Sequence, residues 1–183
     1  MSTFNVLTKN EVSENNQAIF NQLEKGLGFV PNLYATFAHS ETALANFLAI
    51  GNGKTSFSAK EKEVINLAVS QVNECVYCLS AHTAIGKMNG FTEDQILELR
   101  AGTASFDSKL DALAKFARNI ALNRGATDAT ILENLFEQGY TKGNVADAVI
   151  LVGEITITNY LHRTTEVAVD FPEVEVSDIL ETV

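Results

Sequence analysis

The chain has 183 residues, of which 46% are hydrophobic and 20% charged, and its formal net charge at pH 7 is −10. This length suffices for one buried core but is short for two domains, so we expect a single domain over residues 1–183. The acidic balance, without any basic cluster, disfavours binding to nucleic-acid phosphates. No apolar run reaches membrane-spanning length and no leader pattern opens the chain, so we expect a soluble, cytoplasmic protein that does not insert in membranes.

The first half of the chain predicts helices separated by polar turns. Residues 1–20 indicate an arm with an amphipathic turn, 29–32 an extended segment around a proline, and 41–50 a helix. A capping-box pattern at 58–61 predicts a helix that runs to about residue 72. Asn73 is a good N-cap candidate, which places Cys75 in the first turn of a further helix that ends near residue 90.

The second half continues the helical pattern. A second capping box at 92–95 opens a short helix, and apolar residues at helical spacing predict helices over 108–123 and 128–138. Thr141 caps a long helix to about residue 163, whose β-branched middle also resembles two strands, although its length favours a buried helix. We place the core at about 25–165 and a C-terminal arm at about 166–183, which we expect to extend and pack on a neighbouring subunit.

The chemistry-bearing motif is a CxxC pair, Cys75 and Cys78, followed four residues later by His82. On a helix these residues share a face at about 5 to 6 Å, a separation at which a disulfide can close and reopen. Cys75 is nearer the helix N-terminus, which favours a thiolate, whereas Cys78 is nearer the histidine, which can accept its proton. The residues alone therefore leave open which thiol attacks.

Other interpretations compete with a redox pair. Cys75, Cys78 and His82 supply three zinc ligands where structural sites take four, and the cysteines can also serve as small buried hydrophobes. Glu63, twelve residues before the first cysteine, either points inward and orients His82 or simply favours the first helical turn. The other histidines, at 39 and 162, are scattered and belong to no motif.

The run 67–82, preceded by Glu63, resembles the alkylhydroperoxidase D-like branch of the carboxymuconolactone decarboxylase family. The signature of that branch is a glutamate, eleven residues, CxxC, three residues and a histidine, and Glu63, Cys75, Cys78 and His82 match it in type and spacing. Segments at 28–34, 159–161 and 170–172 are similar to its peroxidase-related subgroup, so the resemblance spans about residues 25–172.

The resemblance implies an all-α, alkylhydroperoxidase D-like helical domain with oligomeric helix packing, as a homo-trimer or homo-hexamer. It implies a peroxidase that reduces organic hydroperoxides without a metal or other cofactor. Cys78 would attack the peroxide, Cys75 would resolve the sulfenic acid to a disulfide, and His82 with Glu63 would relay protons. The reductant would be a dithiol donor such as a lipoylated adapter protein.

One position departs from the family pattern, because Tyr77 stands where well-known members carry a histidine before the second cysteine. We expect Tyr77 to contact substrate, with Phe29, Pro31 and Leu33 as further lining groups. The decarboxylases of the family lack the CxxC pair, so decarboxylation is not expected here. The alternative function is a thiol-disulfide exchange or redox-sensing protein without efficient peroxide turnover.

Overall fold

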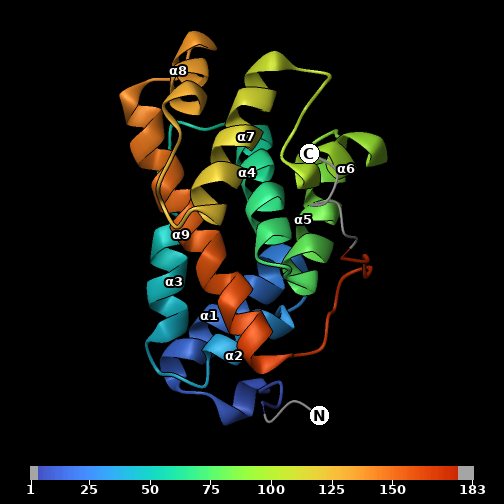
Figure 1. The fold of residues 1–183 in the computed structure, drawn as a ribbon. Coiled ribbons are helices and arrows are strands. Elements are labelled where there is room, and N and C mark those ends of the chain that lie inside the picture. The colour runs from blue at the N-terminus through green and yellow to red at the C-terminus, as the bar shows by residue number, and fades with distance from the viewer. Residues whose placement is uncertain (1–3, 177–183) are drawn as a thin grey trace.

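The computed structural model describes residues 4–176, which form α-helices and a short 3-10 helix at Lys9–Glu11 but no strand (Figure 1). This confirms the predicted all-α class. The helices are α1 (Glu14–Leu27), α2 (Asn32–Phe37), α3 (Ala43–Gly51), α4 (Ala59–Val72), α5 (Val76–Met88), α6 (Glu93–Ala101), α7 (Ser108–Leu122), α8 (Ala129–Glu137) and α9 (Lys142–Thr165). None of the described helices is both long and apolar enough to cross a membrane.

Helix α4 lies at the centre of the main core and contacts α5, α6, α7 and α9. Because neighbouring helices cover α4 on several sides, four of its apolar residues are completely buried: Val64, Ile65, Leu67 and Ala68. The predicted capping box is confirmed: the Ser58 hydroxyl accepts from the Glu61 backbone N–H, and the Glu61 carboxylate accepts from the Ser58 N–H at 2.9 Å. This start fixes the rotation of α4 and with it the direction of each side chain.

The N-terminal helices form a second, smaller cluster at one end of the molecule (Figure 1). The expectation of an arm with one amphipathic turn is wrong for α1, which runs for 14 residues from a Ser13 cap and buries Phe20. Its buried Asn16 amide donates to the carbonyls of Ala38 and Ser40, a long-range tie that periodicity does not reveal. The extended segment is likewise shorter than expected, because α2 begins directly after Pro31.

The junction between α4 and α5 differs from the expectation in its cap. Asn73 ends α4 instead of beginning α5, and the N-cap of α5 is Cys75 itself. The turn needs Glu74 in the left-handed region, at φ 51°, an uncommon conformation for a residue with a Cβ. Cys75 therefore lies outside the helix, with its side chain folded back over the first turn.

Residues 166–176 form a C-terminal strap without helix or strand that returns across α5 (Figure 1). The Tyr77 hydroxyl donates to Asp170 at 2.6 Å, the Val174 N–H donates to the Ser80 hydroxyl at 3.1 Å, and Arg100 donates to the Glu175 carbonyl at 2.6 Å. The described part of the predicted arm thus packs on its own chain. The rest of that prediction, at 177–183, lies outside the described residues.

Candidate functional site

The two cysteines are free thiols buried where α4 meets α5, with Cys75 fully buried and Cys78 at 2% exposure. Their sulfur atoms lie 2.6 Å apart, and the Cys78 backbone N–H donates to Cys75 Sγ at 3.3 Å. Cys78 Sγ also lies 3.7 Å from the Thr158 hydroxyl of α9. The pair is therefore close enough to form a disulfide with only a small movement of the side chains.

The two thiols differ in their electrostatic environment. Hydrogen bonding to the Cys78 side chain lowers the pKa of Cys75 against the opposing effect of burial, and the His162 imidazole and the Cys78 N–H lower it further. Burial raises the pKa of Cys78, and its contact with Cys75 raises it again. When the pair carries one negative charge, that charge is favoured on Cys75.

The structure brings Glu63 of α4 against His82 of α5. Glu63 is 5% exposed, its Oε2 lies 2.8 Å from His82 Nδ1, and its Oε1 accepts from the Asn66 amide at 3.2 Å. Burial lowers the pKa of His82, but the charge and hydrogen bond of Glu63, together with the charges of Glu154 and Cys75, raise it overall. Since Nδ1 faces the carboxylate, Nε2 is the nitrogen that can exchange a proton with a bound molecule.

Cys78 and His82 both line an apolar cavity of about 440 Å³ between α2, α5, α9 and the strap, whereas Cys75 is not in its wall. Exposed apolar residues at the mouth, such as Leu27 and Met88, continue the lining to the surface. The predicted groups Phe29, Pro31, Leu33 and Tyr77 all contribute. The other residues of the wall are Gly26, Leu27, Tyr34, Ala81, Ala84, Ile85, Met88, Thr158 and Phe171.

Tyr77 is a buried wall of this cavity and also a structural tie. Its hydroxyl donates to Asp170 and accepts the Leu33 N–H at 3.3 Å, so it links α5 to the strap and to α2. Burial raises its pKa well above the usual range, and the Asp170 carboxylate raises it further. Tyr77 therefore stays neutral at ordinary pH.

The sequence analysis missed His162, which lies on α9 at 7% exposure. Its Nε2 lies 3.2 Å from the Val167 carbonyl, its Nδ1 is buried without a hydrogen-bond partner, and its ring centroid is 5.4 Å from that of Tyr77. The signal that was present is the spacing: His162 follows Thr158 by four residues, on the buried face that reaches the cysteines. Within residues 4–176, no group of three or more His, Cys, Asp and Glu side chains is placed to hold a metal ion.

The structure thus places a buried CxxC pair beside a glutamate–histidine pair on an all-α scaffold. The family resemblance is confirmed: residues 36–118, which contain Glu63, both cysteines and His82, match the sequence model described as "Carboxymuconolactone decarboxylase family". A curated protein of Bacillus subtilis (strain 168), described as "Uncharacterized protein YdfG", is 24% identical over 108 residues, which cover 58% of this chain and 74% of that protein.

Solved structures share the fold over almost the whole chain. An "uncharacterized peroxidase-related protein" from Ralstonia eutropha JMP134, described as an alkylhydroperoxidase AhpD core, superposes with a TM-score of 0.83 at 21% identity, covering 92% of each chain. Another from Silicibacter sp. TM1040 gives a TM-score of 0.80 at 23% identity over 91% of each chain. The debrominase Bmp8, in complex with 2,3,4-tribromopyrrole, gives 0.75 at 16% identity, covering 93% of this chain and 94% of its own. At these identities the likeness shows the fold alone.

Proposed function

We propose that the protein is a cysteine-based peroxidase that reduces organic hydroperoxides through a dithiol/disulfide cycle of Cys78 and Cys75. The observation that carries this proposal is the position of Cys78: its thiol lines an apolar cavity together with His82, while its sulfur lies 2.6 Å from a second thiol. An attacking thiol, a proton donor and a resolving thiol thus lie together at one pocket, as a thiol peroxidase requires.

In the first step Cys78 attacks the outer oxygen of the peroxide. The Cys78 proton passes to the Cys75 thiolate, 2.6 Å away, and the Cys78 sulfur then displaces the alkoxide, so that the O–O bond breaks and a sulfenic acid forms. His82, whose pKa is raised and whose Nδ1 lies 2.8 Å from Glu63, acts as the acid: its Nε2 gives a proton to the leaving alkoxide and yields an alcohol. The sulfur loses two electrons and the peroxide gains them.

In the second step Cys75 attacks the Cys78 sulfenic acid, which leaves a disulfide and water. An external dithiol then restores both thiols by exchange, becoming a disulfide itself. The burial of both cysteines favours a slender reductant, such as a lipoyl group on an adapter protein, over direct contact with a folded thiol protein. This reductant class remains part of the proposal.

The composition of the cavity favours an organic peroxide over hydrogen peroxide. Leu27, Phe29, Ile85 and Met88 extend an apolar path from the cavity to the surface, and burying an alkyl or aromatic group there contributes about 25 cal/mol per Å². Hydrogen peroxide has no apolar part that can use this surface. We therefore expect kcat/KM for cumene hydroperoxide to exceed that for hydrogen peroxide.

The test follows peroxide consumption with a dithiol reductant in the wild type and in Cys78→Ser, Cys75→Ser and His82→Ala. Turnover is expected in the wild type only, with Cys75→Ser accumulating a sulfenic acid that dimedone traps on Cys78. His39→Ala is the matched control, because His39 is exposed and hydrogen-bonded to the Asn5 carbonyl far from the cysteines. Turnover that survives in Cys78→Ser would overturn the assignment of the attacking thiol.

A redox-sensing or thiol-exchange role is separated by the same assay. A sensor would be oxidised once, stoichiometrically, and would not turn over when reductant is in excess. Because a neighbour of the same fold is described as a debrominase in complex with 2,3,4-tribromopyrrole, that compound belongs in the assay as a second apolar substrate. Bromide release without peroxide turnover would contradict the peroxidase proposal.

A further inference from the structure

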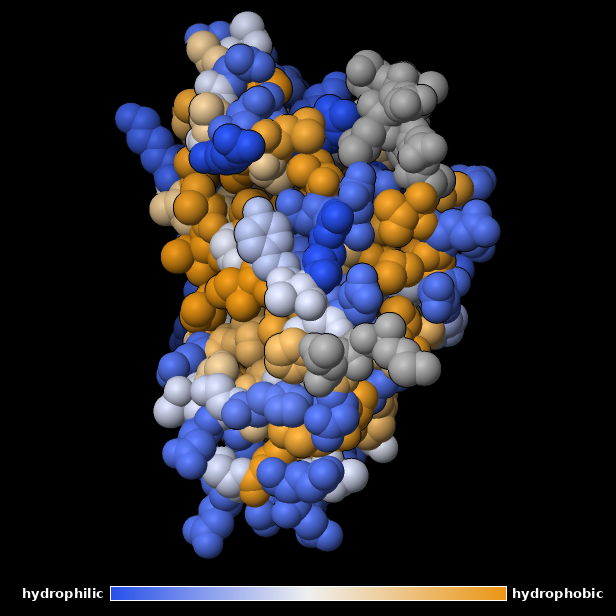
Figure 2. All heavy atoms as spheres, turned by 60° about the horizontal axis from the view of Figure 1, so that its bottom comes forward, coloured by the Kyte–Doolittle hydropathy of each residue, from blue (hydrophilic) through white to orange (hydrophobic). Residues whose placement is uncertain are grey.

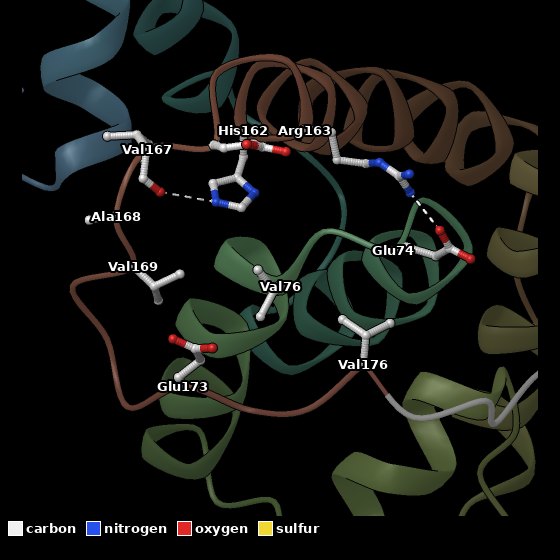
Figure 3. A pocket seen from close by; sticks show the side chains of 10 residues that line it. Glu74, Val76, His162, Arg163, Val167, Ala168, Val169, Glu173 and Val176 are labelled. Carbon is white, nitrogen blue, oxygen red and sulfur yellow. Dashed lines mark hydrogen bonds and ion pairs between the residues drawn. The ribbon is translucent and has the colours of Figure 1, made fainter. Parts of the chain in front are cut away.

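Thr158 is a buried polar side chain in the wall of the apolar cavity, and the proposed cycle has not yet used it. It lies on α9, and its Oγ1 is 3.7 Å from Cys78 Sγ. His162, four residues further along α9, points its ring into a second cavity, of about 690 Å³, which Glu74 and Arg163 also line (Figure 3). Of these two side chains of α9, Thr158 is the one that reaches the cavity of Cys78.

The hydrogen of the Thr158 hydroxyl is used inside the protein. The hydroxyl donates to the Ile155 carbonyl at 2.8 Å, and a rotation would turn the same hydrogen toward the Cys78 sulfur. A hydroxyl has one hydrogen and two acceptor lone pairs. Whichever of the two groups takes the hydrogen, the oxygen keeps a lone pair for another donor. Thr158 therefore offers a bound molecule an acceptor beside the attacking thiol.

A hydroperoxide brings a matching donor to this position. Its terminal oxygen, the one that Cys78 attacks, carries the O–H group. A reacting atom lies about 3 to 3.5 Å from its nucleophile before attack, and hydrogen-bonded hydroxyl oxygens lie about 2.8 Å apart. Because Cys78 Sγ and Thr158 Oγ1 are 3.7 Å apart, one oxygen atom can satisfy both distances at once.

Two neighbouring polar groups of the wall are less suited to accept this hydrogen. The Tyr77 hydroxyl already donates to Asp170 at 2.6 Å and accepts the Leu33 N–H at 3.3 Å, so a bound molecule would have to compete with these bonds. His82 serves the proposed cycle as an acid, and its Nε2 cannot accept while it carries the proton that it gives. The geometry therefore favours Thr158.

We propose that Thr158 accepts a hydrogen bond from the terminal O–H of the hydroperoxide and so holds the attacked oxygen at Cys78. This inference rests on the proposed function and names the group that the site recognises, a peroxide with a free O–H. As the S–O bond forms and the O–O bond breaks, the terminal hydrogen stays on its oxygen, which becomes the sulfenic hydroxyl. The alkoxide takes its proton from His82. Thr158 and His82 thus bind the two ends of the O–O bond.

The first experiment measures the oxidation of Cys78 by one equivalent of cumene hydroperoxide. Thr158→Val keeps the shape of the side chain without the hydroxyl, Thr158→Ser keeps the hydroxyl, and Thr164→Val is the same change at an exposed threonine of α9. We expect Thr158→Val to react about tenfold more slowly, because the O–H of the buried peroxide then lacks its acceptor. Thr158→Ser should recover most of the rate, and Thr164→Val should react like the wild type.

Two results of that experiment would overturn the proposal. One is a wild-type rate in a folded Thr158→Val protein. The other is a loss of rate in Tyr34→Phe that Thr158→Val does not share, since Tyr34 also brings a hydroxyl to the wall of the cavity and would then be the acceptor.

A second measurement separates recognition of the O–H from a general effect on the thiol. Iodomethane reacts with a cysteine but carries no hydrogen-bond donor, and tandem mass spectrometry shows whether Cys78 is the residue methylated. We expect Thr158→Val to be methylated at close to the wild-type rate while its reaction with the hydroperoxide is slowed. An equal loss with both reagents would show that Thr158 supports only the thiol or the fold, and would overturn the proposal.

A third measurement uses the wild type alone and covers the case in which Thr158→Val does not fold. It compares tert-butyl hydroperoxide with tert-butyl methyl peroxide, which lacks the O–H, and divides each rate by that of free dithiothreitol with the same peroxide. The wild type should favour the hydroperoxide at least about tenfold more than the free dithiol does. Equal preferences would remove the role of Thr158 and leave the peroxidase proposal standing. A wild type that reacts with neither peroxide would overturn the proposed function and this inference with it.

Discussion

Cys75 and Cys78 are three residues apart, yet each meets a different environment. Cys78 lines the apolar cavity with His82, whereas Cys75 caps α5 and is not in the cavity wall. The lower pKa of Cys75 and the substrate-side position of Cys78 are therefore not in conflict. A single negative charge on the pair is favoured on Cys75, the thiol that the cavity does not reach, whereas burial raises the pKa of Cys78.

The Glu63–His82 pair makes a prediction about pH. Glu63 raises the pKa of His82 in the folded chain, so the pair stabilises the fold below the ordinary histidine pKa of about 6.5, and this contribution is lost as pH rises through the raised pKa. Glu63→Gln should therefore lower the unfolding temperature more at about pH 5.5 than at about pH 9. It should also lower peroxidase kcat/KM by about 100-fold.

The matched control for that variant is Glu93→Gln, which removes a carboxylate from the exposed 3.3 Å pair with Lys87. Exposed pairs contribute about 0 to 1 kcal/mol, so its effect should be small and nearly independent of pH. Differential scanning calorimetry and the peroxide assay check both variants. An equal loss of stability by Glu63→Gln at both pH values would contradict the role given to the charge on His82.

For individual site residues, the sequence predicts those whose motif lies within a short stretch of the chain. Glu63, Cys75, Cys78 and His82 lie within twenty residues, and helical spacing together with the family signature brought them together before the fold was known. His162 is eighty residues beyond His82, and only the packing of α9 against α5 brings its ring to 5.4 Å from that of Tyr77. Its four-residue spacing from Thr158 indicates a shared helix face but not which residues of other helices pack against that face.

For whole helices, too, the sequence predicts what local signals determine and not what long-range contacts determine. Capping boxes and apolar periodicity predicted α4, α6, α7, α8 and α9 closely, because those signals are local to each helix. The start of α5 was misplaced because Asn73 is as good a cap at the end of one helix as at the start of the next. The path of the strap depends on single long-range bonds, such as Tyr77 to Asp170, that no periodicity encodes.

The strap makes a prediction of its own. Tyr77→Phe removes one hydroxyl and with it the 2.6 Å bond to Asp170 and the 3.3 Å bond from the Leu33 N–H. A hydrogen bond to a carboxylate contributes about 1.5 to 3 kcal/mol, so the free energy of unfolding should fall by roughly that amount in urea denaturation. Tyr160→Phe is the matched control, since Tyr160 is 60% exposed. Equal stabilities of the two variants would show that the strap is not held by Tyr77.

At the scale of the whole molecule, stability depends on the one helix that the others share. Leu67 is completely buried on α4, which contacts α5, α6, α7 and α9. Leu67→Ala should therefore lower the free energy of unfolding by about 2 to 5 kcal/mol, measured by urea denaturation. Leu97→Ala on α6 is the control, because Leu97 is 44% exposed and its truncation should cost about 0.5 kcal/mol or less. A loss below about 1 kcal/mol for Leu67→Ala would contradict a core centred on α4.

The surface of the single chain leaves apolar residues uncovered. Figure 2 shows hydrophobic side chains gathered in groups between hydrophilic ones on the face it presents. On α9, Val149, Ile150, Ile157 and Tyr160 are between 41% and 60% exposed, and their spacings of three, seven and eight residues place them along one side of the helix. A stripe of this kind on a protein surface favours association.

We expect a second copy of the chain to cover that stripe in a homo-trimer or homo-hexamer. Sedimentation equilibrium of the wild type should give three or six times the 19.9 kDa chain mass, and Ile157→Glu should lower it, because the buried carboxylate would lose its water. Leu97→Glu places the same charge on a comparably exposed leucine of α6 and should leave the mass unchanged. A wild type that sediments as a monomer, or an assembly that Ile157→Glu leaves intact, would assign another role to this side of α9.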